Sequence, residues 1–149
     1  LPSLVFQVTS PRNWDQNPRN NVFFINLIIS TAQKYGIGLG FYTNFYDWYQ
    51  ITNGTEVNGF QLWYWNVLGA GPRAETAADF GDFRPFATWT KPTVKQFAQV
   101  ESVCGITVNR DVYAMSGLKQ SKTATTLNDD TPVVGTTFEN TVSNGLLQN

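Results

Sequence analysis

The order in which strand-like and helical stretches follow one another constrains the fold of this chain most. Short apolar runs bounded by Gly, Pro, Ser or Asn predict strands at residues 4–8, 38–43, 62–67, 94–98 and 106–112. Between them the sequence predicts helices over 20–35 and 45–51, and a short helix or turn within 79–92. Strands that alternate with helices favour an α/β chain with a parallel sheet, in which right-handed crossovers place the helices outside.

The stretch 20–35 is the clearest local signal. Its apolar residues recur at helical spacing, at Val22, Ile25, Ile29 and Ala32. Gly36 then provides a residue that can end a helix. A helix of this length between the first two predicted strands is what a parallel β–α–β unit requires.

The last part of the chain has a different composition. Residues 115–149 are rich in Thr, Ser and Asn and show no clear periodicity. We therefore expect one domain over residues 1–114 and a disordered or loosely packed C-terminal tail over residues 115–149.

The composition excludes several kinds of chemistry. The 149 residues contain no histidine, which removes Ser-His-Asp and Cys-His nucleophiles and most zinc sites, and the lone Cys104 cannot form a metal cluster or an internal disulfide. The net charge is -1 without runs of like charge, so a basic nucleic-acid surface is not expected. No apolar run approaches the roughly 18 residues of a membrane span. We expect no cofactor or metal.

Carboxylates, amides, hydroxyls and aromatic rings remain as the chemistry of the chain. Aromatic residues make up 15% of it. Rings that stack on sugars, together with amides and acids that bond to hydroxyls, suit carbohydrate binding or cleavage. The alternative is that the aromatic residues simply fill a core.

Four segments in order resemble one known family. They are LVFQVTSPRNW (4–14), LGFYTNFYDWYQIT (39–52), LWYWN (62–66) and VKQFAQVESVCGITVNRDVY (94–113). Over residues 4–114 the chain is similar to the second half of the glycoside hydrolase family 25 lysozymes of nematodes and amoebae. The resemblance implies about the second half of a (β/α)8 TIM-type barrel, with its site at the C-terminal ends of the strands.

The same resemblance implies an activity. Members of this family are secreted or lysosomal muramidases, which hydrolyse the β-1,4 bonds between N-acetylmuramic acid and N-acetylglucosamine in peptidoglycan, in antibacterial defence or digestion. The expected partner is thus peptidoglycan or a related amino-sugar polymer. Because the chain opens on an apolar strand without an initiator Met or a signal peptide, we expect a fragment or a processed chain.

The family's usual acid pair is missing from the matching positions. The family has Asp-x-Glu at a strand end, where residues two apart point to the same side, and this chain has Gln7 and Thr9 there. Neither side chain can donate a proton to a leaving alkoxide near neutral pH. By resemblance no catalytic pair is intact. Whether the chain is an active hydrolase or a non-catalytic sugar-binding relative stays open, as does whether these two residues bind sugar or only complete the strand end.

Two aspartates remain as candidate site residues, one as an acid and one for binding substrate. Asp111 matches the second position of the family's closing acidic motif, with Asn109 at the first, and both are candidates, Asp111 as an acid and Asn109 for binding. An ion pair between Asp111 and Arg110 is the alternative. Asp47 follows the second strand and either binds substrate or caps the next helix.

The other candidate sugar contacts are Tyr42 and Gln96, which match positions of the family's strands, and Trp65 and Asn66, which lie near the C-terminal end of the strand predicted at 62–67. Trp63 is expected to be structural.

Four further acids are expected to lie outside any site. Glu75, Asp79 and Asp82 are expected in a solvated loop, because calcium ligands need tighter spacing, and Glu101 is expected at a rim. A half barrel with exposed edges is also expected to self-associate when expressed alone.

Overall fold

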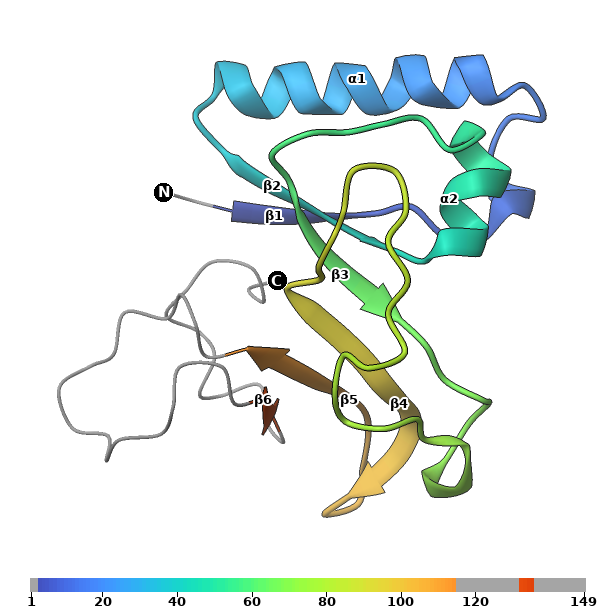
Figure 1. Cartoon of the computed structure of the whole chain (residues 1–149), viewed down its shortest axis with the longest axis vertical. Coiled ribbons are helices and arrows are strands. Elements are labelled where there is room, and N and C mark those ends of the chain that lie inside the picture. Colours follow the sequence, from blue (N-terminus) through green and yellow to red (C-terminus); the bar gives the residue numbers. More distant parts are fainter. Residues whose placement is uncertain (1–2, 115–131, 136–149) are drawn as a thin grey trace, which may run out of the picture.

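The computed structural model describes residues 3–114 and 132–135, which form one six-stranded mixed sheet in the order β1-β2-β3-β4-β5-β6 (Figure 1). The strands are β1 (Ser3–Gln7), β2 (Gly38–Thr43), β3 (Gln61–Trp65), β4 (Val94–Val103), β5 (Ile106–Ala114) and β6 (Pro132–Gly135). The helices are α1 (Pro18–Lys34) and α2 (Phe45–Thr52), with short 3-10 turns η1 (Pro11–Asn13) and η2 (Pro72–Ala74). Strands β1 to β4 are parallel.

The first half of the chain confirms the predicted strand–helix alternation. Helix α1 begins after Asn17, whose side chain accepts a hydrogen bond from the Arg19 N–H, and Pro18 occupies its first position. Gly36, with φ 64°, follows the end of the helix. The helix lies along the β1–β2 part of the sheet (Figure 1) and buries Ile25 and Ala32. The capping residue, the proline and the glycine in the local sequence are therefore enough to predict the β1–α1–β2 unit.

An aromatic cluster fills the space between the sheet and its helices. The Phe41 ring lies 5.6 Å from the Trp48 ring and 5.9 Å from the Trp89 ring, centroid to centroid, and all three meet edge to face. Trp48 is fully buried and Trp89 is nearly so. These three aromatic residues therefore belong to the core, as the alternative to sugar binding predicted.

The prediction of a wholly parallel sheet is wrong for the last strands. β4 and β5 pair antiparallel through the two-residue turn Cys104-Gly105, whose φ angles are 51° and 80°. A parallel crossover needs a dozen or more residues, so this connection permits only a hairpin. Strand β4 also runs to Val103, well past the predicted end at residue 98, and its ladder is interrupted by bulges.

The fold class is thus mixed α/β, with a sheet curled as a half-barrel. Residues 132–135, which were expected to lie in an irregular tail, form β6 and pair with β5. The rest of the predicted tail lies outside the described residues. The (β/α)8 assignment and the domain boundary after residue 114 stay predictions.

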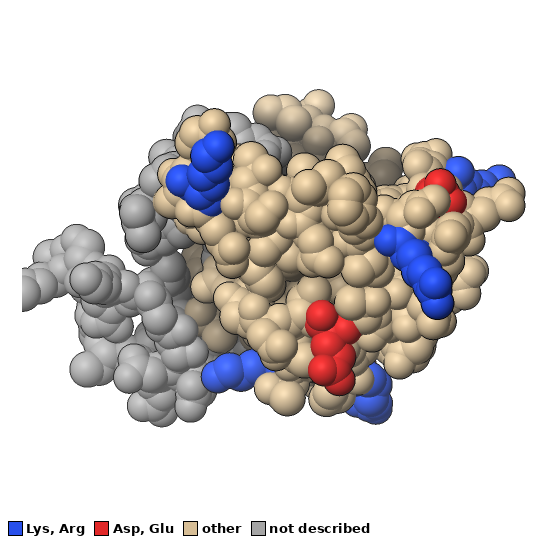
Figure 2. Space-filling model, turned by 90° about the horizontal axis from the view of Figure 1, so that it is seen from above, with Lys and Arg blue, Asp and Glu red and all other residues tan. Residues whose placement is uncertain are grey.

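Two features bear on the expected self-association. Within the described residues β1 has a strand on one side only. On the face seen from above, where α1 lies, most of the surface is uncharged and the basic side chains lie apart (Figure 2). Helix α1 exposes Phe23 and Leu27, at 66% and 47% of their surface. Self-association of the isolated chain stays a prediction.

Asn21 joins α1 to α2 and to the preceding loop. Its buried amide donates to the Asp15 and Ile51 carbonyls, both at 2.9 Å. Replacing Asn21 by Ala should lower the free energy of unfolding by about 1–3 kcal/mol in urea denaturation, because buried carbonyls lose their donor. The control Asn20→Ala removes only an exposed bond to the Asp15 carboxylate and should change stability by less than about 0.5 kcal/mol. Equal losses in the two variants would contradict this role.

Candidate functional site

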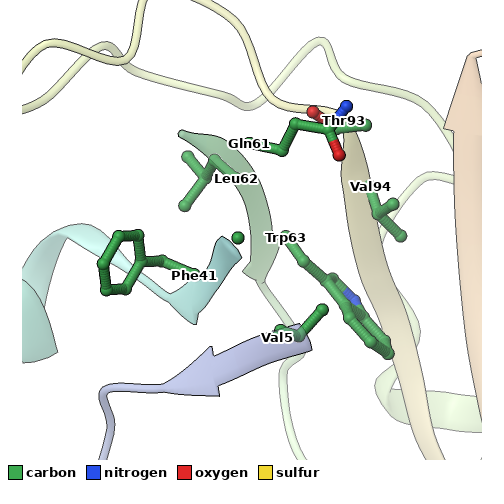
Figure 3. Close-up of a pocket in the computed structure, with 8 residues that line it drawn as sticks. Val5, Phe41, Gln61, Leu62, Trp63, Thr93 and Val94 are labelled. Carbon is green, nitrogen blue, oxygen red and sulfur yellow. The ribbon is translucent and has the colours of Figure 1, made fainter. Parts of the chain in front are cut away.

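Strands β2, β3, β4 and β5 bring four side chains together on the sheet face opposite α1, near the C-terminal ends of β2 and β3 and close to the start of β4. We call Tyr42, Trp63, Gln96 and Asp111 the strand-end cluster. Tyr42 lies beside Trp63 in the β2–β3 register, and Gln96 lies opposite Asp111 in the β4–β5 register. Because side chains alternate along a strand, Trp63 points away from the core-facing Phe41 and Leu62, as Figure 3 shows.

Hydrogen bonds and ring contacts connect the cluster. The Tyr42 hydroxyl donates to Gln96 Oε1 at 2.7 Å, and Trp63 Nε1 donates to Asp111 Oδ1 at 2.9 Å. The Tyr42 and Trp63 rings meet edge to face at 5.2 Å. The structure thus joins the predicted site residues Tyr42, Gln96 and Asp111. Trp63, expected to be structural, was missed, although its two-residue spacing from Trp65 placed both on one side of β3.

Asp111 has an unusual protonation equilibrium for an aspartate. Burial raises the pKa of its carboxyl to about 7, against the opposing effect of the Trp63 N–H bond. Its neighbour Arg110 does not pair with it, because adjacent residues of a strand point to opposite faces. Arg110 instead binds Glu75 at 2.8 Å and Glu101 at 3.3 Å. The alternative of an Asp111–Arg110 ion pair is therefore wrong.

Asp47 is buried in the first turn of α2. Its helix is capped by Asn44, whose Oδ1 accepts from the Asp47 backbone N–H at 2.7 Å, so the capping alternative for Asp47 is wrong. Burial raises the pKa of the Asp47 carboxyl, and a bond from the Ser10 backbone N–H opposes the rise. Ser10 follows the end of β1, so this carboxyl lies beside that strand end.

Tyr42 lies within electrostatic reach of both candidate acids. Burial raises the pKa of its hydroxyl, and the charges of Asp111 and Asp47 raise it further. The hydroxyl therefore stays protonated and acts as a hydrogen-bond donor. Two carboxyl groups with raised pKa values thus lie close enough to Tyr42 to affect its pKa.

Gln7 and Thr9 bond to each other at the end of β1. Gln7 Nε2 donates to Thr9 Oγ1 at 2.7 Å, and Gln7 is paired in register with Tyr42. Gln7 is exposed. The two residues that stand where the resemblance expects acids therefore form a neutral polar pair next to the strand-end cluster.

A cavity of about 470 Å³ lies beside the cluster. We call it the aromatic groove; its lining residues are Asn44, Phe45, Tyr46, Tyr64, Trp65, Asn66, Asp82, Phe83, Arg84 and Phe86. It contains the predicted contacts Trp65 and Asn66, and the Asn66 backbone N–H donates to the Gln96 carbonyl at 3.1 Å. The groove and the cluster therefore share the ends of β2 and β3.

Asp82 is not the solvated loop residue that was expected. Its carboxylate accepts from the Tyr64 hydroxyl at 2.6 Å and from the Asn66 amide, and it pairs with Lys95 Nζ at 2.9 Å. Burial opposes its ionisation, but the bonds from Tyr64, Lys95 and Asn66 outweigh it and lower the pKa of Asp82. Lys95 is fully buried and also donates to the Ala77 carbonyl at 2.7 Å.

Three other predicted positions lie outside the cluster. Asn109 is exposed, and its Oδ1 accepts from the Val100 N–H at 3.2 Å at a bulge of β4, so the structure does not bring it to Asp111. Glu75, expected in solvent, and Glu101, expected at a rim, share Arg110. Glu101 is buried, with only 5% of its surface exposed.

Within residues 3–114 and 132–135, no three His, Cys, Asp or Glu side chains gather as metal ligands would. The same described segments contain no helix with the length and apolarity to cross a membrane.

Comparison with known proteins identifies the family. A family model described as Lysozyme-like protein 1 matches residues 1–97. Lysozyme-like protein 2 of Caenorhabditis elegans is 57% identical over 117 residues, which are 77% of this chain and 42% of that protein. Lysozyme-like protein 7 of the same organism is 58% identical over 72% of this chain and 38% of its own length.

A more distant relative comes from an amoeba. Probable GH family 25 lysozyme 4 of Dictyostelium discoideum is 34% identical over 63% of this chain and 41% of its own length. The chain thus spans about two fifths of the length of these relatives. No solved structure matches it at a significant level. The chain belongs to the lysozyme-like family, and the resemblance to the family 25 lysozymes of nematodes and amoebae is confirmed.

Proposed function

We propose that the protein is a muramidase, which hydrolyses β-1,4 bonds between N-acetylmuramic acid and N-acetylglucosamine in peptidoglycan. The observation that supports it best is the Asp111 carboxyl, whose pKa is raised to about 7 at the end of a strand-end cluster. The names of the relatives, which are lysozymes or lysozyme-like proteins, agree with this activity. Secretion or lysosomal location, and a role in antibacterial defence or digestion, belong to the same proposal.

Glycoside hydrolysis needs an acid to protonate the leaving oxygen and a second group that stabilises charge or activates water. Asp111 retains a proton near neutral pH and is the candidate acid. Asp47, the other carboxyl within reach of Tyr42, is the candidate second group. If Asp111 and Asp47 have these roles, the site keeps two carboxyl groups although Gln7 and Thr9 stand where the family has its acid pair.

The neutral polar side chains have binding roles in this proposal. Gln7 and Thr9 bond to acetamido and hydroxyl groups of the sugar, and Tyr42 with Gln96 orients the ring above Asp111. The indole of Trp65, which lines the aromatic groove, offers a surface on which a sugar ring stacks.

The experiment that tests the proposal uses the full-length protein. It is assayed for clearing of suspended bacterial cell walls and, in parallel, for retention on insoluble peptidoglycan. Clearing supports the muramidase. Retention without clearing favours the alternative, a non-catalytic peptidoglycan-binding relative, which the neutral Gln7–Thr9 pair would then explain. Absence of both clearing and retention rejects the substrate class.

A further inference from the structure

We propose that Arg84 makes the aromatic groove a specificity site, in which its guanidinium binds a carboxylate carried by the amino-sugar polymer. The groove would then distinguish peptidoglycan strands, whose muramyl residues carry acids, from uncharged amino-sugar polymers. The inference rests on the proposed function, because it concerns the same substrate and an adjoining part of the site.

The groove continues the strand-end cluster along the edge of the sheet. Trp65 lies opposite Gln96 in the β3–β4 register, and the Asn66 N–H bonds to the Gln96 carbonyl. On the other side Asn44 follows β2 two residues after Tyr42. A polymer held over the cluster therefore extends into the groove without leaving the sheet edge.

The groove has the size and the lining of a ligand site. Its volume of about 470 Å³ falls within the usual range for small-ligand pockets. Phe45 and Tyr46 expose 53% and 64% of their surfaces, and the Phe45 ring lies 4.7 Å from the Tyr49 ring. Adjoining exposed rings leave apolar area in water that a sugar face covers on binding.

The charge of the groove favours an acidic ligand. The charge of Asp82 is compensated by the buried Lys95 at 2.9 Å, and its remaining capacity is used by Tyr64 and Asn66. Arg84 is exposed and pairs with no carboxylate among the residues that the structure describes. The groove thus presents one uncompensated positive charge.

The guanidinium is held in place with donors to spare. Its Nη1 donates to the Phe83 carbonyl at 3.1 Å and to the Gly81 carbonyl at 3.4 Å. These bonds use one nitrogen of a planar group that has five N–H donors. The remaining donors suit the two oxygens of a carboxylate, which Arg binds with two parallel bonds. An uncharged polymer has no group that makes the same contact.

The test measures the binding of full-length variants to three soluble ligands. These are peptidoglycan glycan strands with peptide stems, the same strands after an amidase has removed the stems and freed the lactyl carboxylates, and chitin oligomers. Arg84→Gln should weaken binding to the acid-bearing strands by about tenfold and leave chitin binding unchanged. Arg84→Lys should recover part of the loss. The matched control is Arg73→Gln, an exposed arginine outside the groove, and it should bind all three ligands as the wild type does.

The ligand series identifies the source of the carboxylate. A loss with stem-free strands points to the lactyl acid, and a loss confined to stem-bearing strands points to the peptide; both support the proposal. Unchanged affinity of Arg84→Gln for both strands overturns it, as does an equal loss on chitin. Clearing of cell walls by the wild type, measured in parallel, reports on the proposed function separately. If the wild type clears cell walls and Arg84→Gln binds the strands with unchanged affinity, only the proposal for the groove is rejected. If binding of the strands depends on Arg84 but the wild type does not clear cell walls, only the proposed hydrolysis is rejected.

Discussion

Replacing Asp111 by Asn is expected to slow cell-wall clearing by the full-length protein about 10²–10⁴-fold, the usual loss when a positioned general acid is removed. The amide oxygen of Asn can still accept the Trp63 Nε1–H bond, so the variant should fold. The matched control is Asp79→Asn, the same change at an exposed residue outside the cluster and the groove, and it should clear at the wild-type rate. An Asp111→Asn variant with more than half of the wild-type rate would remove Asp111 from the mechanism.

The same variant should change two pH profiles. Because the pKa of Asp111 is about 7 in the folded protein, wild-type clearing should fall as pH rises through 7 and the acid loses its proton. The ordinary aspartate pKa of about 3.9 applies to the unfolded chain, so the folded state binds the proton more tightly. Asp111 should therefore lower the free energy of unfolding progressively from about pH 4 to pH 7. Asp111→Asn should abolish this contribution, as urea denaturation across that range would detect.

Replacing Asp82 by Asn should destabilise the fold by about 3 kcal/mol, the low end of the range for breaking a buried ion pair. Lys95 is fully buried and would keep its charge without a compensating carboxylate, while the Asp82 side chain is 30% exposed, which limits the loss. The change is measured by urea denaturation and should appear as a lower midpoint with an unchanged slope.

Removal of the other partner of the ion pair, Lys95, is the control for Asp82→Asn. Lys95→Met should cost less, about 1 kcal/mol, because Asp82 keeps its Tyr64 and Asn66 donors and its partial exposure. The double variant should be more stable than Asp82→Asn alone, since no buried charge is then left unpaired.

In the wild type the lowered pKa of Asp82 stabilises the fold fully above about pH 4, and this contribution is lost as pH falls through the lowered value. If Asp82→Asn were as stable as the wild type, the prediction would be wrong, because solvent and not Asp82 would then compensate the charge of Lys95.

The site was predictable where the chain matches motifs of the family. Tyr42 and Gln96 were identified at such motif positions, and the structure places Tyr42 near the end of β2 and Gln96 level with the end of β3. The structure does not bring Asn109 to Asp111, because at a bulge of β4 its side chain accepts a bond from the Val100 N–H, and two-residue periodicity contains no information on bulges. The strands predicted at 94–98 and 106–112 were too close in sequence for a parallel crossover, so their antiparallel pairing could have been predicted.

The sequence by itself determined the elements that depend on neighbours along the chain. Asn17, Pro18 and Gly36 bound α1 through bonds and dihedral angles within a few residues, and the composition excluded histidine chemistry outright. Only the tertiary structure decided which acids matter. Asp111 meets Trp63 from a position 48 residues away, and Asp82 meets the buried Lys95 across a loop. The physical reason is that a pKa depends on burial and on the charges and donors in space, which a position in the sequence does not specify.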